Sequence, residues 1–270
     1  MTNYVANGKR PLGFIPTEGR GGVLVRLSGL LTMPRPSKET AGILPSLFSC
    51  DVDGVIADAR TIREQANSFR GRRSPAFLIS VDWADDLTHT QGVTSVTDEE
   101  AGVRSAVKEA FNLGASAIAT CFFVGHRNDQ DEARNFAFVS KLIDECDELG
   151  LPALVGAVPI GDRPTKETYV DCVGLAGRMA SEAGASFVTI PYAGSQESVQ
   201  RTVEVMGVPT YLMELGEKMS EGQPDCELED LLSTAVKTES CGVVLLASGG
   251  PRGIEKVKRA VDRLHGGDSF

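Results

Sequence analysis

Four side chains that could donate or accept a proton follow short apolar runs in the sequence, namely Asp82, His126, Tyr192 and Glu214. Carboxylate, imidazole and phenol groups are common general acids and bases in enzymes. Asp58 also follows an apolar run, and it could face Asp82 as the second member of an acid–base pair. An aspartate in such a place more often caps a loop or a helix, so this alternative stays open for Asp58.

His126 and Tyr192 each have two interpretations. His126 could be a general base, or a metal ligand together with Glu214, but a solvated loop histidine beside Arg127 is the favoured interpretation. The three histidines lack the ligand spacing of a zinc site, so we expect no metal and no cofactor. Tyr192 could donate a proton or pack at the rim of the site.

A glycine-rich segment, 248–253, precedes the last helical pattern and reads Ser-Gly-Gly-Pro-Arg-Gly. Backbone N–H groups of such a loop, together with a helix N-terminus, form a site for anions. We therefore expect a substrate or phosphate site, and its candidate residues are Asp58, Thr189, Gly216, Ser248, Gly249, Gly250 and Arg252. A plain turn into a helix is the alternative for this segment, because loops of this kind are often rich in glycine.

The elements that must position these residues are eight apolar runs that alternate with helical patterns. The predicted strands lie at 23–27, 54–59, 76–82, 117–124, 152–158, within 184–195, at 209–213 and at 242–248. Continuous apolar runs are typical of parallel strands buried on both faces. We predict a single (β/α)8 TIM barrel over residues 22–270, preceded by an irregular arm at 1–21. A doubly wound sheet is less favoured because no Gly-x-Gly-x-x-Gly segment follows the first strand.

In such a barrel the active site lies at the carboxyl ends of the strands, and the candidate residues named above fall there. The chain has 270 residues and a formal net charge of −10, which favours a small-molecule substrate over nucleic acid or an anionic membrane. The six cysteines lack close spacing, so we expect free thiols. No signal peptide and no apolar run near about 18 residues is visible, which favours the cytoplasm. We also expect a homo-oligomer, with the arm packed across the barrel or on a neighbouring subunit.

Three segments in order resemble a known family. They are 110–118, 149–154 and 184–192, and the last reads Gly-Ala-Ser-Phe-Val-Thr-Ile-Pro-Tyr. This series resembles class I aldolases of the deoxyribose-phosphate and tagatose-bisphosphate clan, in particular the archaeal-type fructose-bisphosphate aldolases. The resemblance extends over most of the chain from Gly22 onward, and it implies the barrel fold.

The resemblance also implies a mechanism in which a lysine on the sixth strand forms an imine with a ketone. That lysine position is occupied by Thr189, which cannot form an imine. The family's tyrosine on the fifth strand falls at Val158, and its Asp-His-Gly on the first strand is replaced around 27–29.

Three functions follow from these departures. We expect an enzyme that acts on a small phosphorylated or anionic carbonyl compound by acid–base chemistry without a lysine imine. The alternatives are an inactive homologue that serves as a binding or assembly partner, and an imine-forming aldolase with a displaced lysine such as Lys218.

Overall fold

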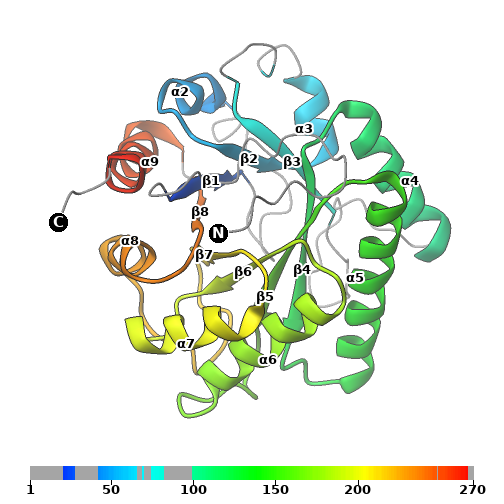
Figure 1. The fold of residues 1–270 in the computed structure, drawn as a ribbon, viewed down its shortest axis with the longest axis vertical. Coiled ribbons are helices and arrows are strands. Elements are labelled where there is room, and N and C mark those ends of the chain that lie inside the picture. Colours follow the sequence, from blue (N-terminus) through cyan, green and yellow to red (C-terminus); the bar gives the residue numbers. More distant parts are fainter. Residues whose placement is uncertain are drawn as a thin grey trace.

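The computed structural model describes residues 21–27, 42–65, 69, 74–81, 99–247 and 249–266, and within them eight parallel strands form a closed barrel in sequence order (Figure 1). The strands are β1 Gly22–Arg26, β2 Gly54–Ala57, β3 Ala76–Ser80, β4 Ala117–Val124, β5 Ala153–Pro159, β6 Phe187–Pro191, β7 Thr210–Met213 and β8 Gly242–Leu246. Each strand pairs with the next one along the chain, and β8 pairs with β1. The predicted TIM barrel is confirmed.

The helices of the described residues surround the strands as an outer ring (Figure 1). They are α2 Leu44–Ser49, α3 Ala59–Glu64, α4 Glu99–Leu113, α5 Asp129–Leu149, α6 Tyr169–Glu182, α7 Gln196–Met206, α8 Leu228–Lys237 and α9 Gly250–His265. Local signals set several of their ends. Gly150 ends α5 in the left-handed conformation (φ 67°), and the Ser195 hydroxyl caps the N-terminus of α7.

The strands place alternate side chains on opposite faces, and this alternation divides the core into two layers. Between strands and helices lies a large apolar layer that includes Val23, Val25 and Ile118. Inside the barrel lies a second layer, with Leu24, Ile56, Leu78, Leu154, Phe187, Tyr211 and Val244. The described part of the barrel interior is therefore largely filled with side chains.

Several sequence predictions are settled by this architecture. All six cysteines are free thiols. Strand β8 ends at Leu246, two residues before the predicted end. Among the described helices, none is long and apolar enough to cross a bilayer. The predicted arm at 1–21 lies outside the described residues apart from Gly21, whose N–H donates to the Leu264 carbonyl at 3.1 Å.

Candidate functional site

A buried arginine lies inside the barrel at the carboxyl end of β1. Arg26 points inward because it is two residues after the inward-facing Leu24, and only 7% of it is exposed. Its Nη2 donates to the Ser80 hydroxyl at 3.2 Å, and its Nη1 lies 3.9 Å from the Cys121 sulfur. Our sequence reasoning missed Arg26. The available signal was a charged residue at the end of an otherwise apolar strand.

Thr189 lies inside the same end of the barrel, on β6, and is 4% exposed. Its hydroxyl donates to the Met213 sulfur at 3.6 Å, which is a weak interaction. Gly156 of β5 has no side chain and so leaves a gap in the interior here. A Cβ atom at this position would lie 3.0 Å from Cys121 Sγ and 3.2 Å from Thr189 Oγ1. Thr189 and Cys121 therefore flank the gap at Gly156, and Arg26 lies beside Cys121.

These interior residues line a small central cavity of about 10 Å³, whose wall includes Arg26, Gly156, Thr189, Met213 and Glu214. A cavity of this size accommodates about one water-sized group. The barrel centre can therefore receive a single atom such as an oxygen, while the rest of a ligand must lie elsewhere.

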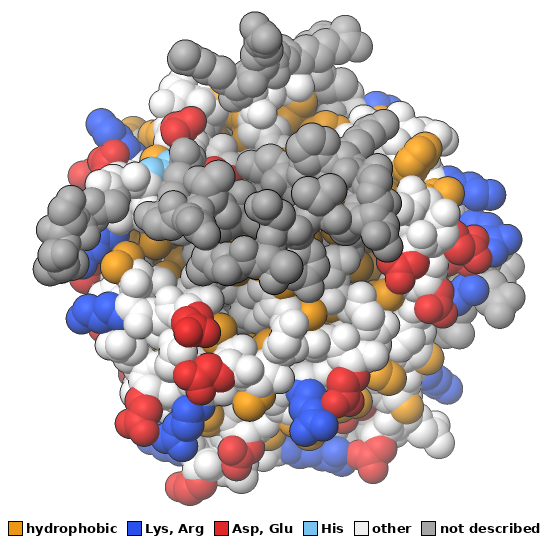
Figure 2. All heavy atoms as spheres, in the orientation of Figure 1, with side chains coloured by type: hydrophobic (Ala, Val, Ile, Leu, Met, Phe, Trp, Pro, Cys, Tyr) orange, Lys and Arg blue, Asp and Glu red, His pale blue; other side chains and the backbone are white. Residues whose placement is uncertain are grey.

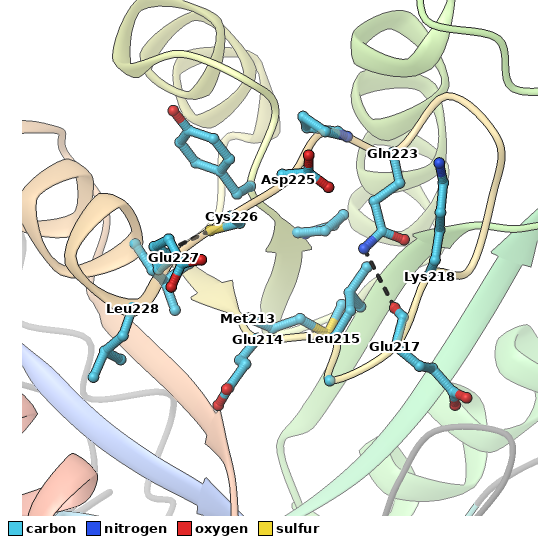
Figure 3. A pocket seen from close by; sticks show the side chains of 15 residues that line it. Met213, Glu214, Leu215, Glu217, Lys218, Gln223, Asp225, Cys226, Glu227 and Leu228 are labelled. Atoms are coloured by element: carbon cyan, nitrogen blue, oxygen red, sulfur yellow. Dashed lines mark hydrogen bonds between the residues drawn. The ribbon is translucent and has the colours of Figure 1, made fainter.

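A larger cavity of about 320 Å³ lies where β6 and β7 end, under the loop that connects β7 to α8 (Figure 3). Tyr192, Gly216, Lys218 and Cys226 line it, with apolar side chains from the start of α8. The two cavities adjoin, since both have Met213 and Glu214 in their walls. Acidic residues outnumber basic ones around the larger cavity, where Glu214, Glu217, Asp225 and Glu227 accompany Lys218.

Glu214 lies between the two cavities and is held by α9 and β8. Its Oε2 accepts from the Leu246 N–H at 2.8 Å and from Lys256 Nζ at 2.9 Å. The same ammonium group donates to the Leu246 carbonyl at 2.6 Å. Glu214 thus joins the ends of two strands to a helix, and its role as an acid or base stays a prediction.

Tyr192 is half-buried at the end of β6, in the wall of the larger cavity. Burial raises the pKa of its phenol, and the nearby Asp230 and Cys226 raise it further. Cys226 is exposed as a residue, but the atoms packed around its thiol desolvate it and raise its pKa to about 12, with a contribution from Asp230. Both groups therefore stay protonated at neutral pH, and the phenol is suited to donate a proton or a hydrogen bond.

The burial of His126 contradicts the interpretation that the sequence favoured. It is 3% exposed, so the prediction of a solvated loop histidine is wrong. The chain turns at Gly125 (φ 97°), which follows β4, and the imidazole lies edge-on to Phe123 with ring centres 6.5 Å apart. The proposed catalytic role of His126 stays a prediction.

Asp58 caps a helix, which is the alternative that the sequence left open for this residue. Its Oδ1 accepts from the Thr61 N–H at 3.0 Å and its Oδ2 from the Thr61 hydroxyl at 2.6 Å. Both carboxylate oxygens are therefore engaged at the start of α3, which leaves a role in substrate binding as a prediction. The predicted partner, Asp82, lies outside the described residues.

The predicted phosphate residues lie at neighbouring strand ends. Gly249 caps α9, Gly250 is left-handed with φ 77°, and Arg252 is exposed on the first turn. Gly216 is near them, since a Cβ atom there would lie 2.3 Å from a methyl group of Leu246 at the end of β8. Ser248 lies outside the described residues, and the phosphate site stays a prediction.

The lysines of the described residues lie outside the strands, and Lys218 is exposed as the sequence suggested. Lys256 is partly buried, but its ammonium is hydrogen-bonded to Glu214 and to the Leu246 carbonyl. Lys256 lines neither cavity, so its amine is not placed to form an imine with a ligand bound there. In the part of the chain that the structure describes, no group of three His, Cys, Asp or Glu residues is arranged to hold a metal ion.

Side chains of both signs are interspersed around the periphery of the face in Figure 2. The outer helices carry many of these charges as local ion pairs, for example Arg178 with Glu182 on α6 at 2.7 Å and Arg201 with Glu197 on α7 at 3.1 Å. Such exposed pairs stabilise the fold weakly.

Comparison with known proteins agrees with this architecture. An uncharacterised aldolase of Saccharolobus solfataricus is 30% identical over 250 residues, which cover 92% of this chain and 90% of the relative. A 2-amino-3,7-dideoxy-D-threo-hept-6-ulosonate synthase of Archaeoglobus fulgidus is 25% identical, over 97% of this chain and 93% of the relative. The crystal structure of an archaeal fructose 1,6-bisphosphate aldolase superposes with a TM-score of 0.69 at 20% identity, over 94% of this chain and 97% of that chain. The model of the DeoC/LacD family aldolases matches residues 46–265, and the chain belongs to this family.

Proposed function

We propose that this protein is an enzyme that acts on a small phosphorylated or otherwise anionic carbonyl compound without forming a lysine imine. The observation that carries the proposal is Thr189, a buried threonine at the barrel centre on β6, where the resemblance places the family's lysine. A hydroxyl cannot form an imine with a ketone. The reaction is then carbon–carbon bond cleavage or formation, or an isomerisation, driven by proton transfer.

The cavities support this chemistry by their sizes and polar groups. The larger cavity, about 320 Å³, is at the small end of the range for ligand pockets. Tyr192 faces it as a protonated phenol, and Glu214 lies where it meets the central cavity. We assign the proton transfers to Asp82, His126, Tyr192 and Glu214.

The acidic wall of the larger cavity bears on where an anionic group would lie. A phosphate beside Glu217, Asp225 and Glu227 would meet like charges. The loops at Gly216 and Gly249–Gly250 offer backbone N–H groups and the start of α9 instead, with Arg252 nearby. We therefore assign the anionic end of the substrate to these loops and its uncharged carbon chain to the larger cavity.

The names of the relatives are consistent with this substrate class. One is named for synthesis of a heptulosonate and others for fructose bisphosphate. Both names denote carbonyl compounds that carry an anionic group. In the arrangement that we propose, the carbonyl group of such a compound would lie at the barrel centre. Its anionic group would lie at the loops that contain Gly216 and Gly249.

A second candidate function is that of an inactive homologue that binds a ligand or assembles with another enzyme. The state of Glu214 favours it, because the carboxylate is engaged by Lys256 and by the Leu246 N–H. These contacts give the carboxylate a structural role in joining β7 and β8 to α9, which an inactive homologue would retain.

Borohydride trapping tests the imine directly. The protein is incubated with dihydroxyacetone phosphate and sodium borohydride, and its intact mass is measured, with an archaeal fructose-bisphosphate aldolase as the positive control. We expect the mass to stay unchanged in this protein and to rise in the control. A reduced adduct on any lysine would refute the proposal and restore the imine mechanism.

Turnover separates the enzyme from the inactive homologue. Sugar phosphates are screened by their effect on the melting temperature, and each ligand found is tested for conversion by NMR. We expect turnover that Asp82→Asn reduces without abolishing ligand binding. Stabilisation by ligands that are never converted would favour the binding protein.

A further inference from the structure

We propose that Arg26 binds the carbonyl oxygen of the substrate and stabilises the enolate that develops there. This inference rests on the proposed function and deepens it, because it names the group that replaces the imine as the acceptor of electrons. Arg26 would then be a catalytic residue at the end of β1, in the central cavity that Thr189 also lines.

The chemistry requires such a group. In the cleavage of a β-hydroxy carbonyl compound, the bond between the α and β carbons breaks and the β-hydroxyl proton passes to a base. The β carbon leaves as an aldehyde, and the electron pair of the broken bond moves into the α carbon and carbonyl unit. An imine accepts this pair on its protonated nitrogen. Without an imine, the carbonyl oxygen becomes an enolate oxygen, which positive charge and fixed hydrogen-bond donors stabilise.

Arg26 supplies positive charge in a fixed position. The residue is 7% exposed, and its guanidinium donates to the Ser80 hydroxyl at 3.2 Å and lies 3.9 Å from the Cys121 sulfur. Guanidinium carries five N–H donors in a rigid fork, so a group that donates to Ser80 can also donate into the cavity that it lines. A donor positioned before the reaction stabilises the developing charge without reorganisation.

The size of the central cavity fits a single oxygen. Its volume of about 10 Å³ suits one water-sized atom. The adjoining larger cavity, which shares Met213 and Glu214, has room for the remaining carbon chain. A carbonyl group directed from the larger cavity toward Arg26 would thus place its oxygen in the small space.

The threonine on β6 is consistent with this assignment. Arg26 and Thr189 line the same small cavity, so a lysine at position 189 would bring a second cation beside the guanidinium. Like charges at such short range disfavour each other in a buried site. The other described cations near the cavities are less suited, since neither Lys218 nor Lys256 lines the central cavity.

The test compares enolate formation with ground-state binding in Arg26→Gln and Arg26→Lys. Dihydroxyacetone phosphate is incubated in D2O, and exchange of its hydroxymethyl C–H protons is followed by ¹H NMR. Binding is measured for this compound and for phosphoglycolohydroxamate, which mimics the enediolate. Arg178→Gln, an exposed substitution on α6, is the control. Circular dichroism and melting temperatures verify folding, and Arg26→Lys, which retains the charge, covers the case in which Arg26→Gln fails to fold.

We expect exchange by the wild-type protein to fall about 100- to 1,000-fold in Arg26→Gln and less in Arg26→Lys. Hydroxamate affinity should fall by a similar factor, while affinity for dihydroxyacetone phosphate falls less than about 10-fold. Exchange at the wild-type rate in folded Arg26→Gln, or an equal loss of affinity for both compounds, overturns the role of Arg26 and leaves the proposed function standing. No exchange by the wild-type protein overturns the proposed function, while the hydroxamate comparison still decides the role of Arg26. Binding of neither compound by the wild-type protein overturns both.

Discussion

Replacing Lys256 by methionine should destabilise the barrel where its last two strands meet α9. The ammonium of Lys256 lies 2.9 Å from Glu214 Oε2 and 2.6 Å from the Leu246 carbonyl. The side chains of Lys256 and Glu214 are 19% and 29% exposed, so water screens this pair less than an ion pair on the surface. Methionine retains an unbranched apolar stem but lacks the charge and the N–H donors.

The magnitude follows from the interactions that are lost. A hydrogen bond to a charged group contributes about 1.5–3 kcal/mol when buried, and exposed pairs contribute about 0.2–1 kcal/mol. For a partly exposed pair we expect a loss of about 1.5–2 kcal/mol, because Glu214 retains its bond from the Leu246 N–H. In a chain of this size each kcal/mol lowers the melting temperature by about 2–4 °C, so the decrease should be about 3–8 °C.

Urea unfolding followed by circular dichroism measures this loss, with Lys258→Met as the matched control. Lys258 is exposed on the same helix, and its replacement should change stability by less than about 0.5 kcal/mol. A double-mutant cycle with Glu214→Gln then isolates the coupling between the two residues. Equal effects of the Lys256 and Lys258 substitutions would refute the structural role that we assign to this pair.

Three further predictions concern other parts of the barrel. Gly242→Ala should destabilise the protein by more than about 3 kcal/mol in urea unfolding, because its Cβ atom would lie 2.0 Å from the Gly22 carbonyl oxygen at a φ of 141°. Gly174→Ala on α6, where a Cβ atom meets nothing within 4 Å, should instead be neutral or stabilising; equal losses in both variants would contradict this reasoning. Cys226 should react with iodoacetamide at pH 8 about 50-fold more slowly than glutathione, because its pKa of about 12 leaves little thiolate. Mass spectrometry measures the rate, and a rate like that of glutathione would exclude the raised pKa. Glu145 has a lowered pKa, chiefly through its hydrogen bond from Arg104, so its contribution to stability is present above the ordinary pKa near 4.5 and is lost as the pH falls through the folded value. The acid unfolding profile of Glu145→Gln should be flatter than that of the wild-type protein in this window, and identical profiles would contradict the assignment.

The strands could be predicted from the sequence because each is a local signal. Eight apolar runs separated by helical patterns are visible along the chain, and the structure places β4 at the predicted residues, 117–124. Helix ends with a capping signal were also predictable, as at Ser195 and Gly150. The start of α6 at Tyr169 lacks such a signal, since Thr168 makes no capping hydrogen bond through its side chain.

The candidate site was predictable in part. The rule that barrel enzymes use the carboxyl ends of strands led to Tyr192, Glu214 and Thr189, which do line the two cavities. The same rule suggested substrate binding by Asp58, which caps α3 and whose role in binding stays a prediction. It did not identify Arg26, since the rule considers residues after a strand and Arg26 is the last residue within one.

The sequence by itself determined the order of strands and helices, the barrel, the likeness to aldolases and the absence of lysine at position 189. These features depend on local periodicity and on residues close together in the chain. Only the tertiary structure decided which side chains meet inside the barrel. Arg26 lies beside Cys121, 95 residues away, and Glu214 is joined to Lys256, 42 residues away. Alternation along a strand determines the face that each residue occupies, but the register between strands and the docking of helices determine which residues lie at the same level.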